Sequence, residues 1–281
     1  MTPHDCPELR VAGRTVARLV TRPELPETLS PRPYLHPVTT LSGQAVTDLC
    51  PDDHPHHLGV GVAVADVEGH NFWGGRTFVR GRGPTELDNH GVQRHTGFTR
   101  RTDDRFTHEL SWVAAGRELL REERTVAAVP LTSAAWALDV AFTLTNVTGA
   151  PLTVGSPATN GRPGAAYGGF FWRARTEDEP PAVFSADRDG EAEAHGRPAD
   201  WLALAGRTWT LVFTAGDDAT RRDAWFVRAA EYPGVGSSLA LDDRLPIAPG
   251  ESVARRVVTV VADGRLDRAE AAALAMRAVS P

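Results

Sequence analysis

Residues 134–146, AAWALDVAFTLTN, decide the fold class of this 281-residue chain. The large apolar residues of this stretch stand at every second position: Trp136, Leu138, Val140, Phe142 and Leu144. A period of two places these side chains on one face of an extended strand and leaves smaller or polar residues on the other. The stretch therefore predicts an antiparallel strand with one buried face, which a second layer of structure must cover.

Similar strand-like stretches occur on both sides, at 106–113, 118–128, 201–204, 208–214, 224–229 and 253–262. The 26 glycines and 21 prolines separate short apolar runs, as is typical of all-β proteins. About a dozen strands predict a large antiparallel sandwich of two sheets, similar to a supersandwich. The Pro-rich segment 21–37 is expected to be an irregular surface crossing.

Only residues 266–279 have the pattern of a convincing helix, with Asp267 and Glu270 in its first turn. Its alanine-rich face buries little area, so we expect an accessory helix that covers a sheet edge or end and contributes no catalytic group. No Ser/Gly linker or charge block divides the chain, which favours a single domain over residues 1–281.

Composition narrows the functional classes. The net charge of −6, with dispersed lysine and arginine residues, argues against binding to nucleic acid or to an anionic membrane. Cys6 and Cys50 are the only cysteines and have no metal-type spacing, which fits a reduced cytosol, with a single disulfide as the alternative. There is no signal-peptide pattern and no long apolar run, so we expect a soluble cytoplasmic protein.

The stretch 52–59, DDHPHHLG, has three of the ten histidines within four positions. Pro55 stiffens it, and an extended backbone would place His54 and His56 on one face and His57 on the other. The run that follows, 58–67, has one face of glycine and alanine, which either packs tightly or forms the floor of a ligand site. We interpret this corner as an active site.

The histidines allow two kinds of chemistry. His54 and His56 could bind a divalent metal with His95 or Glu86, and the aspartates at 48, 52 and 53 could hold the second ring nitrogens. Alternatively, one histidine is a general acid or base on a polar substrate. Arginines recur in the segments assigned to the pocket, and cations disfavour a nearby metal, so we predict a metal-free site without a cofactor.

The stretch 121–124, REER, places a charged pair on each face of a predicted strand. Arg121 and Glu123 form either an ordinary ion pair or a functional pair, in which Glu123 is a base and Arg121 holds a substrate oxygen. Individual aromatic residues are more often core than ligand platforms, but seven tryptophans among 20 aromatic residues suit stacking against sugar rings. The expected substrate-binding residues are Trp73, Arg121, Arg162, Tyr167, Trp172 and Arg228.

Five segments, DHPHHLG, NFWGG, REER, RPGAAYGGFFWR and WFVR, together resemble a bacterial family labelled methane oxygenase-like (PmoA-like), from about residue 32 to 264. The label does not fit a methane mono-oxygenase subunit, which needs transmembrane helices. The resemblance implies a soluble β-sandwich of a kind that often occurs beside sugar oxidoreductases, which suggests a functional pairing with such an enzyme. It also implies sheets similar to those of galactose mutarotases. Those enzymes use a histidine acid and a carboxylate base, which implies His54, His56 or His57 with His95 and Glu123.

The sequence thus predicts a lyase, isomerase or hydrolase that performs acid/base chemistry on a sugar or oxidised sugar. Epimerisation, elimination and hydrolysis are all compatible with this interpretation. The expected catalytic residues are His54, His56, His57, His95 and Glu123. Two alternatives stay open: a metal-dependent enzyme with His54, His56 and His95 as ligands, and a non-catalytic sugar-binding or sensor module.

Overall fold

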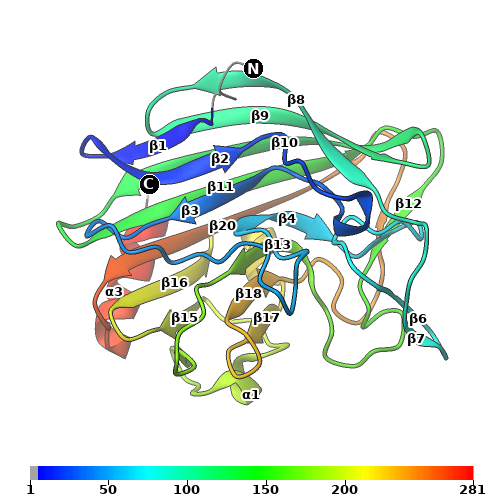
Figure 1. The fold of residues 1–281 in the computed structure, drawn as a ribbon. Coiled ribbons are helices and arrows are strands. Elements are labelled where there is room, and N and C mark those ends of the chain that lie inside the picture. Colours follow the sequence, from blue (N-terminus) through cyan, green and yellow to red (C-terminus); the bar gives the residue numbers. More distant parts are fainter. Residues whose placement is uncertain (1–5, 281) are drawn as a thin grey trace.

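Two large antiparallel sheets stacked face to face form the body of the computed structural model, which describes residues 6–280 (Figure 1). The seven-stranded sheet has, in spatial order, β1 (Glu8–Val11), β2 (Arg14–Val20), β3 (Tyr34–Val38), β4 (Val60–Val64), β13 (Gly168–Arg173), β18 (Gly234–Ser237) and β17 (Trp225–Arg228). The eight-stranded sheet has β14 (Ala182–Ser185), β15 (Trp201–Ala205), β16 (Trp209–Ala215), β20 (Ser252–Asp263), β11 (Ala135–Asn146), β10 (Arg117–Pro130), β9 (Arg105–Ala114) and β8 (Val92–Arg101).

Shorter elements complete the fold. A three-stranded sheet joins β19 (Leu245–Ile247), β12 (Leu152–Gly155) and β5 (Asp66–Val67), and a hairpin joins β6 (Thr77–Val79) and β7 (Gly83–Thr85). The helices are η1 (Glu27–Leu29), α1 (Glu191–Ala194), α2 (Asp218–Arg221) and α3 (Arg268–Val279). The predicted all-β class is confirmed. Among the described residues, no helix is both long and apolar enough to cross a membrane.

Strand β11 has the two faces that its alternation predicts. Its five large apolar side chains are buried in the core between the sheets: Trp136, Leu138, Val140, Phe142 and Leu144. Along its length, β11 pairs with β10 on one side and with β20 on the other. The sandwich interior is therefore assembled from alternate residues of central strands.

Helix α3 lies against the outer face of the eight-stranded sheet, so the expectation that it covers a sheet edge or end is wrong (Figure 1). Ala271 and Ala275 pack on small side chains of that face: Ala135, Ala137, Ala203, Val212, Val258, Val260 and Ala262. A face of alanine and valine needs cover from water, and helix alanines allow a close approach. The helix begins at Arg268 because Asp267 caps it, in a capping box with Glu270.

The charged pair of β10 that faces the interior is Glu122 and Arg124, which are 0% and 2% exposed. Arg124 Nε donates to Glu122 Oε1 at 2.6 Å and Trp112 Nε1 donates to Glu122 Oε2 at 2.8 Å. Arg124 Nη1 also donates to Pro33 O, next to β3 in the opposite sheet, at 3.2 Å. This buried network joins the two sheets.

The Pro-rich segment 21–37 is the expected irregular surface crossing at residues 21–29 but not beyond them. Residues 32–35 are buried, and the segment ends in β3, between β2 and β4. Its prolines are compatible with this position because β3 pairs with β4 only at Leu35–Val60 and with β2 through an irregular register.

Candidate functional site

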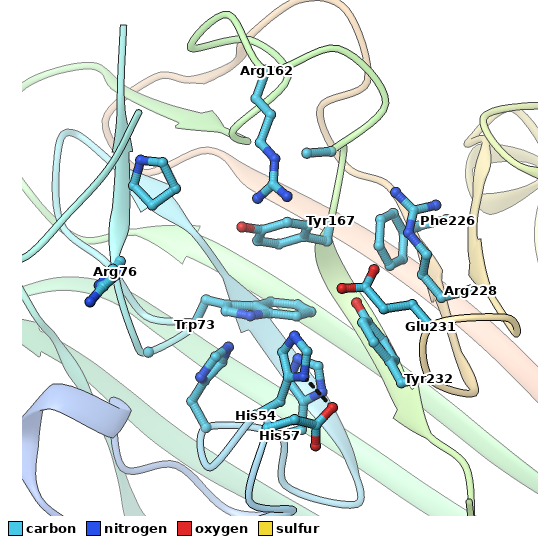
Figure 2. A pocket seen from close by; sticks show the side chains of 15 residues that line it. His54, His57, Trp73, Arg76, Arg162, Tyr167, Phe226, Arg228, Glu231 and Tyr232 are labelled. Atoms are coloured by element: carbon cyan, nitrogen blue, oxygen red, sulfur yellow. Dashed lines mark hydrogen bonds and ion pairs between the residues drawn. The ribbon is translucent and has the colours of Figure 1, made fainter. Parts of the chain in front are cut away.

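A pocket of about 240 Å³ lies on the outer face of the seven-stranded sheet (Figure 2). Strands β4, β13 and β17 send Val62, Trp172 and Val227 into the sandwich interior. Their alternate residues, Ala63, Phe171 and Phe226, form a separate cluster with Trp73 and Tyr232 at the pocket. The pocket is lined by Asp53, His54, His56, His57, Trp73, Gly74, Arg76, Pro84, Arg162, Ala165, Tyr167, Phe226, Arg228, Glu231 and Tyr232.

The histidine loop, residues 50–58, folds as two consecutive turns. The His54 backbone N–H donates to Pro51 O at 2.9 Å, and the His57 N–H donates to His54 O at 2.9 Å. Pro55 has the second position of the second turn, where its fixed φ is favourable. The expectation of an extended backbone with His57 on the opposite face is therefore wrong, because the turns bring all three imidazoles together.

The three imidazoles form a compact cluster. The His54 ring stacks on the His57 ring, with 4.6 Å between centroids and 17° between planes, and His56 meets His57 edge-on at 4.8 Å. The centroid of the Tyr232 ring lies 4.7 Å from that of His54 and 5.0 Å from that of His57. Burial lowers the pKa of His57 far below its ordinary value, and burial with the charge of Arg32 lowers the pKa of His56 to about 3. These two imidazoles are neutral at physiological pH.

His54 is paired with a carboxylate. Its Nδ1 lies 2.7 Å from Asp53 Oδ2. Partial burial alone would raise the pKa of Asp53, but the hydrogen bond and charge of His54 hold it below its usual range. An ionised Asp53 accepts the Nδ1–H, so Nε2 is the nitrogen that can exchange a proton with a bound molecule.

Arg32 holds the histidine loop in place, although it does not line the pocket. Its buried guanidinium donates to four backbone carbonyls, those of His56 at 2.7 Å, Trp73 at 2.9 Å, Ser30 at 3.0 Å and Leu29 at 3.2 Å. Burial lowers its pKa to about 9, so it stays charged at neutral pH. Arg32 thus fixes His56 and Trp73 relative to each other.

The NFWGG segment presents Trp73 to the pocket. Asn71 Oδ1 accepts from the backbone N–H of Trp73 and of Gly74, each at 2.8 Å, which folds the loop tightly. Gly74 has a φ of +100°, and a Cβ there would lie 2.6 Å from Leu29 O and 2.8 Å from His56 Cβ. The glycine pair is needed because the loop passes so close to His56.

Strand β17 carries Phe226 and Arg228 on its outer face, as their spacing predicts, and the Arg228 guanidinium lies 4.6 Å above the Phe226 ring. Arg228 donates to Val227 O at 2.8 Å and to Gly164 O at 3.2 Å. His195, after α1, bridges Gly164 O and the Val227 N–H. Burial lowers the pKa of His195, and the neutral ring supports this end of the pocket.

Figure 2 shows the remaining pocket groups around an aromatic centre. Tyr167 lies over Trp73, with 4.6 Å between ring centroids, and the Arg162 guanidinium points toward the Tyr167 ring from above. The Glu231 carboxylate extends into the space between Tyr232 and Arg228. Burial raises the pKa of Tyr167 and of Tyr232, so both phenols stay protonated.

The pocket brings together most of the residues that the sequence selects. Seven of the predicted site residues line it: His54, His56, His57, Trp73, Arg162, Tyr167 and Arg228. Glu231, Tyr232 and Arg32 escaped the sequence interpretation, because they lie in irregular segments where no period or motif marks them. Asp53 was expected only as a support for a metal ligand.

Four predicted site residues lie elsewhere, and their assignment to this pocket is wrong. Trp172 points to the other side of β13, where its Nε1 donates to Val46 O at 3.0 Å. Arg121 and Glu123 are exposed on the outer face of the eight-stranded sheet, and Arg121 pairs with Glu118 at 3.1 Å. His95 belongs to edge strand β8, where it packs on Phe98 and His108.

The expected metal ligands do not come together either. His54 and His56 lie in the pocket, but His95 is on β8, and Glu86 is an exposed residue that pairs with Arg76 at 3.4 Å. Within residues 6–280, no group of three or more His, Cys, Asp or Glu side chains is arranged to hold a metal ion.

Comparisons with known proteins give a family and distant structural likenesses. The model of a family of unknown function, DUF6807, matches residues 6–276. No curated protein matches the chain. Heparan sulfate lyase HepC from Pedobacter heparinus is similar with a TM-score of 0.30 and 10% identity over 63% of this chain and 22% of that one. A polysaccharide lyase has a TM-score of 0.37 and 12% identity over 94% of this chain and 34% of its own. The chain thus spans about a fifth to a third of these structures.

Proposed function

This chain belongs to the DUF6807 family, and we propose that it is an enzyme that transfers a proton on a carbohydrate or sugar-derived substrate. The supporting observation is the Asp53–His54 pair at the edge of a pocket whose centre is the Trp73 ring. A histidine held by a carboxylate is a common general acid or base. Trp73 itself is only 4% exposed, and together with Tyr167 and Tyr232 it gives the pocket an aromatic lining that suits the C–H groups of a sugar.

The proposed roles follow from the placement of the charged groups. His54 Nε2 exchanges a proton with the substrate, while Asp53 stabilises the imidazolium that forms. Glu231 is the second acid or base, in the role that the sequence interpretation gave to Glu123. Two groups that exchange protons with one bound sugar suit epimerisation, elimination or hydrolysis.

The neutral histidines beneath His54 contribute to its position. His57 gives His54 an uncharged stacking surface. Tyr232 closes the side of the stack. The cluster therefore orients one imidazole rather than supplying three equivalent catalytic groups.

The experiment is a proton NMR survey in D₂O with pooled sugars, sugar acids and glycosides. Epimerisation through a carbanion replaces C–H by C–D, elimination creates alkene signals, and hydrolysis and mutarotation change the anomeric signals. We expect one of these changes with the native protein and its loss with His54→Gln at unchanged thermal stability. Binding of a sugar without any conversion would support the sugar-binding module instead.

A further inference from the structure

The charges that line the pocket are unequal. Three guanidinium groups, Arg76, Arg162 and Arg228, face two carboxylates, Asp53 and Glu231. The buried imidazoles of His56 and His57 are neutral, so they add no positive charge. Carboxylates just outside the lining can also compensate these arginines, so a site for an anion needs a guanidinium that has no carboxylate partner.

Among the three arginines, two already have carboxylate partners. Arg228 Nη1 lies 3.7 Å from Glu191 Oε1, and its other donors contact backbone carbonyls. Arg76 pairs with Glu86. Arg162 has no carboxylate partner among the described residues, and its guanidinium points into the pocket above Tyr167 (Figure 2).

The turn that carries Arg162 is fixed before any ligand binds. The Arg162 backbone N–H donates to Pro157 O at 2.8 Å, and Arg162 O accepts from Ala165 N–H at 3.2 Å. Next to it, Asn160 Nδ2 donates to Asp66 Oδ2 at 2.8 Å, and Asp66 also forms a bidentate ion pair with Arg244. The backbone beneath the guanidinium is therefore held in advance, which lowers the entropic cost of binding.

We propose that the pocket selects sugars that carry a carboxylate, and that Arg162 is the residue that binds it. The protonated Tyr167 hydroxyl is a second donor beside Arg162. One guanidinium without a carboxylate partner suits the single charge of a carboxylate, whereas a phosphate monoester carries nearly two charges at pH 7. This inference rests on the proposed function and specifies its substrate class.

The test is titration calorimetry at low ionic strength with D-glucuronate, D-galacturonate and D-gluconate. The comparison ligands are D-glucose, D-galactose and D-glucose 6-phosphate. We expect the carboxylates to bind at least roughly tenfold more tightly than the neutral sugars, as is typical when a charge-assisted hydrogen bond is added. Arg162→Met should remove that preference, while Arg117→Met, an equal charge change at the exposed first residue of β10, should retain it.

The inference would be overturned if no acidic sugar bound, or if neutral and acidic sugars bound with equal affinity. Unchanged carboxylate binding in Arg162→Met would overturn it as well. So would tighter binding of D-glucose 6-phosphate than of the sugar carboxylates. The outcome for catalysis is separate. Arg162-dependent carboxylate binding without turnover would support this inference and contradict the proposed enzyme. Turnover of neutral sugars that is insensitive to Arg162→Met would support the proposed enzyme and contradict this inference.

Discussion

Single residues outside the pocket determine whether its side chains are in position. Arg32 is the strongest case, because one buried guanidinium contacts the histidine loop and the Trp73 loop at the same time. A buried arginine without a carboxylate partner is unusual, and here four backbone carbonyls accept its hydrogen bonds instead. The position of the histidine cluster thus depends on a residue that does not line the pocket.

Arg32→Met should lower the free energy of unfolding by about 2–4 kcal/mol, because it leaves buried carbonyls without donors. Urea denaturation measures this change. Arg14→Met removes an exposed arginine that contacts Leu41 O, and it should change stability by less than about 0.5 kcal/mol. Equal small effects of both substitutions would show that the carbonyl contacts of Arg32 contribute nothing.

The residues of the site were predictable to the extent that they belong to local patterns. The unusual density of histidine and the fixed φ of Pro55 marked the loop at 50–58, and the alternation of WFVR placed Phe226 and Arg228 on one face. The two turns that bring the His57 ring next to the His54 ring depend on backbone hydrogen bonds, which the alternation of apolar and polar residues does not predict. Glu231 follows β17 in an irregular loop, where no period identifies it.

At the scale of the element, strand β10 shows why a sequence pattern can fail. Both of its faces carry a charged pair and apolar neighbours, so alternation alone could not tell which pair is buried. The partners decide it: Trp112 and Gln93 supply buried donors and acceptors to Glu122 and Arg124. The sequence pattern therefore favours Arg121 and Glu123 as the functional pair, although they are the exposed one.

Glu122→Gln should destabilise the protein by about 3–5 kcal/mol, because it leaves the charge of Arg124 buried without a carboxylate. The matched substitution Glu123→Gln changes the neighbouring exposed residue of the same strand and should cost less than about 0.5 kcal/mol. Chemical denaturation of both variants tests the assignment of faces. A larger loss in Glu123→Gln than in Glu122→Gln would contradict it.

At the scale of the whole molecule, the apolar pattern was sufficient for the two-sheet architecture but not for the placement of α3 or of the pocket. The pocket needs segments within residues 53–84 and 162–232 to meet on the outer face of one sheet, and such long-range contacts leave no local signal. The same burial that builds the sandwich encloses His57 and His108, which are 1% and 0% exposed.

These histidines should make the fold sensitive to acid. Burial lowers the pKa of both below about 6.5, the value expected in the unfolded chain. Above pH 6.5 both states hold neutral imidazoles, so no pH dependence arises. Below it the unfolded chain binds protons that the folded chain does not, so the free energy of unfolding falls as pH falls.

His108→Phe should reduce that loss between pH 7 and pH 5 by roughly 1–2 kcal/mol, since it removes one buried group that titrates only in the unfolded state. His108 has no hydrogen-bond partner within the described residues, so the substitution should not destabilise the protein at pH 7. Denaturation at both pH values is the measurement. The control is His70→Gln, which removes a half-exposed histidine. An unchanged pH dependence in His108→Phe would refute this account of acid sensitivity.

The most direct test of the central claim is kcat/KM for two matched pairs of variants, with the substrate identified by the NMR survey. His54→Gln and Glu231→Gln change groups that line the pocket, whereas His95→Gln and Glu123→Gln change the same residue types outside it. We predict that each pocket variant lowers kcat/KM by roughly 10²–10⁴-fold, the range for a lost general acid or base, and that the outside variants stay within about threefold of the native protein. Full activity in His54→Gln, or a large loss in His95→Gln or Glu123→Gln at unchanged stability, would contradict the claim that the reaction takes place at this pocket.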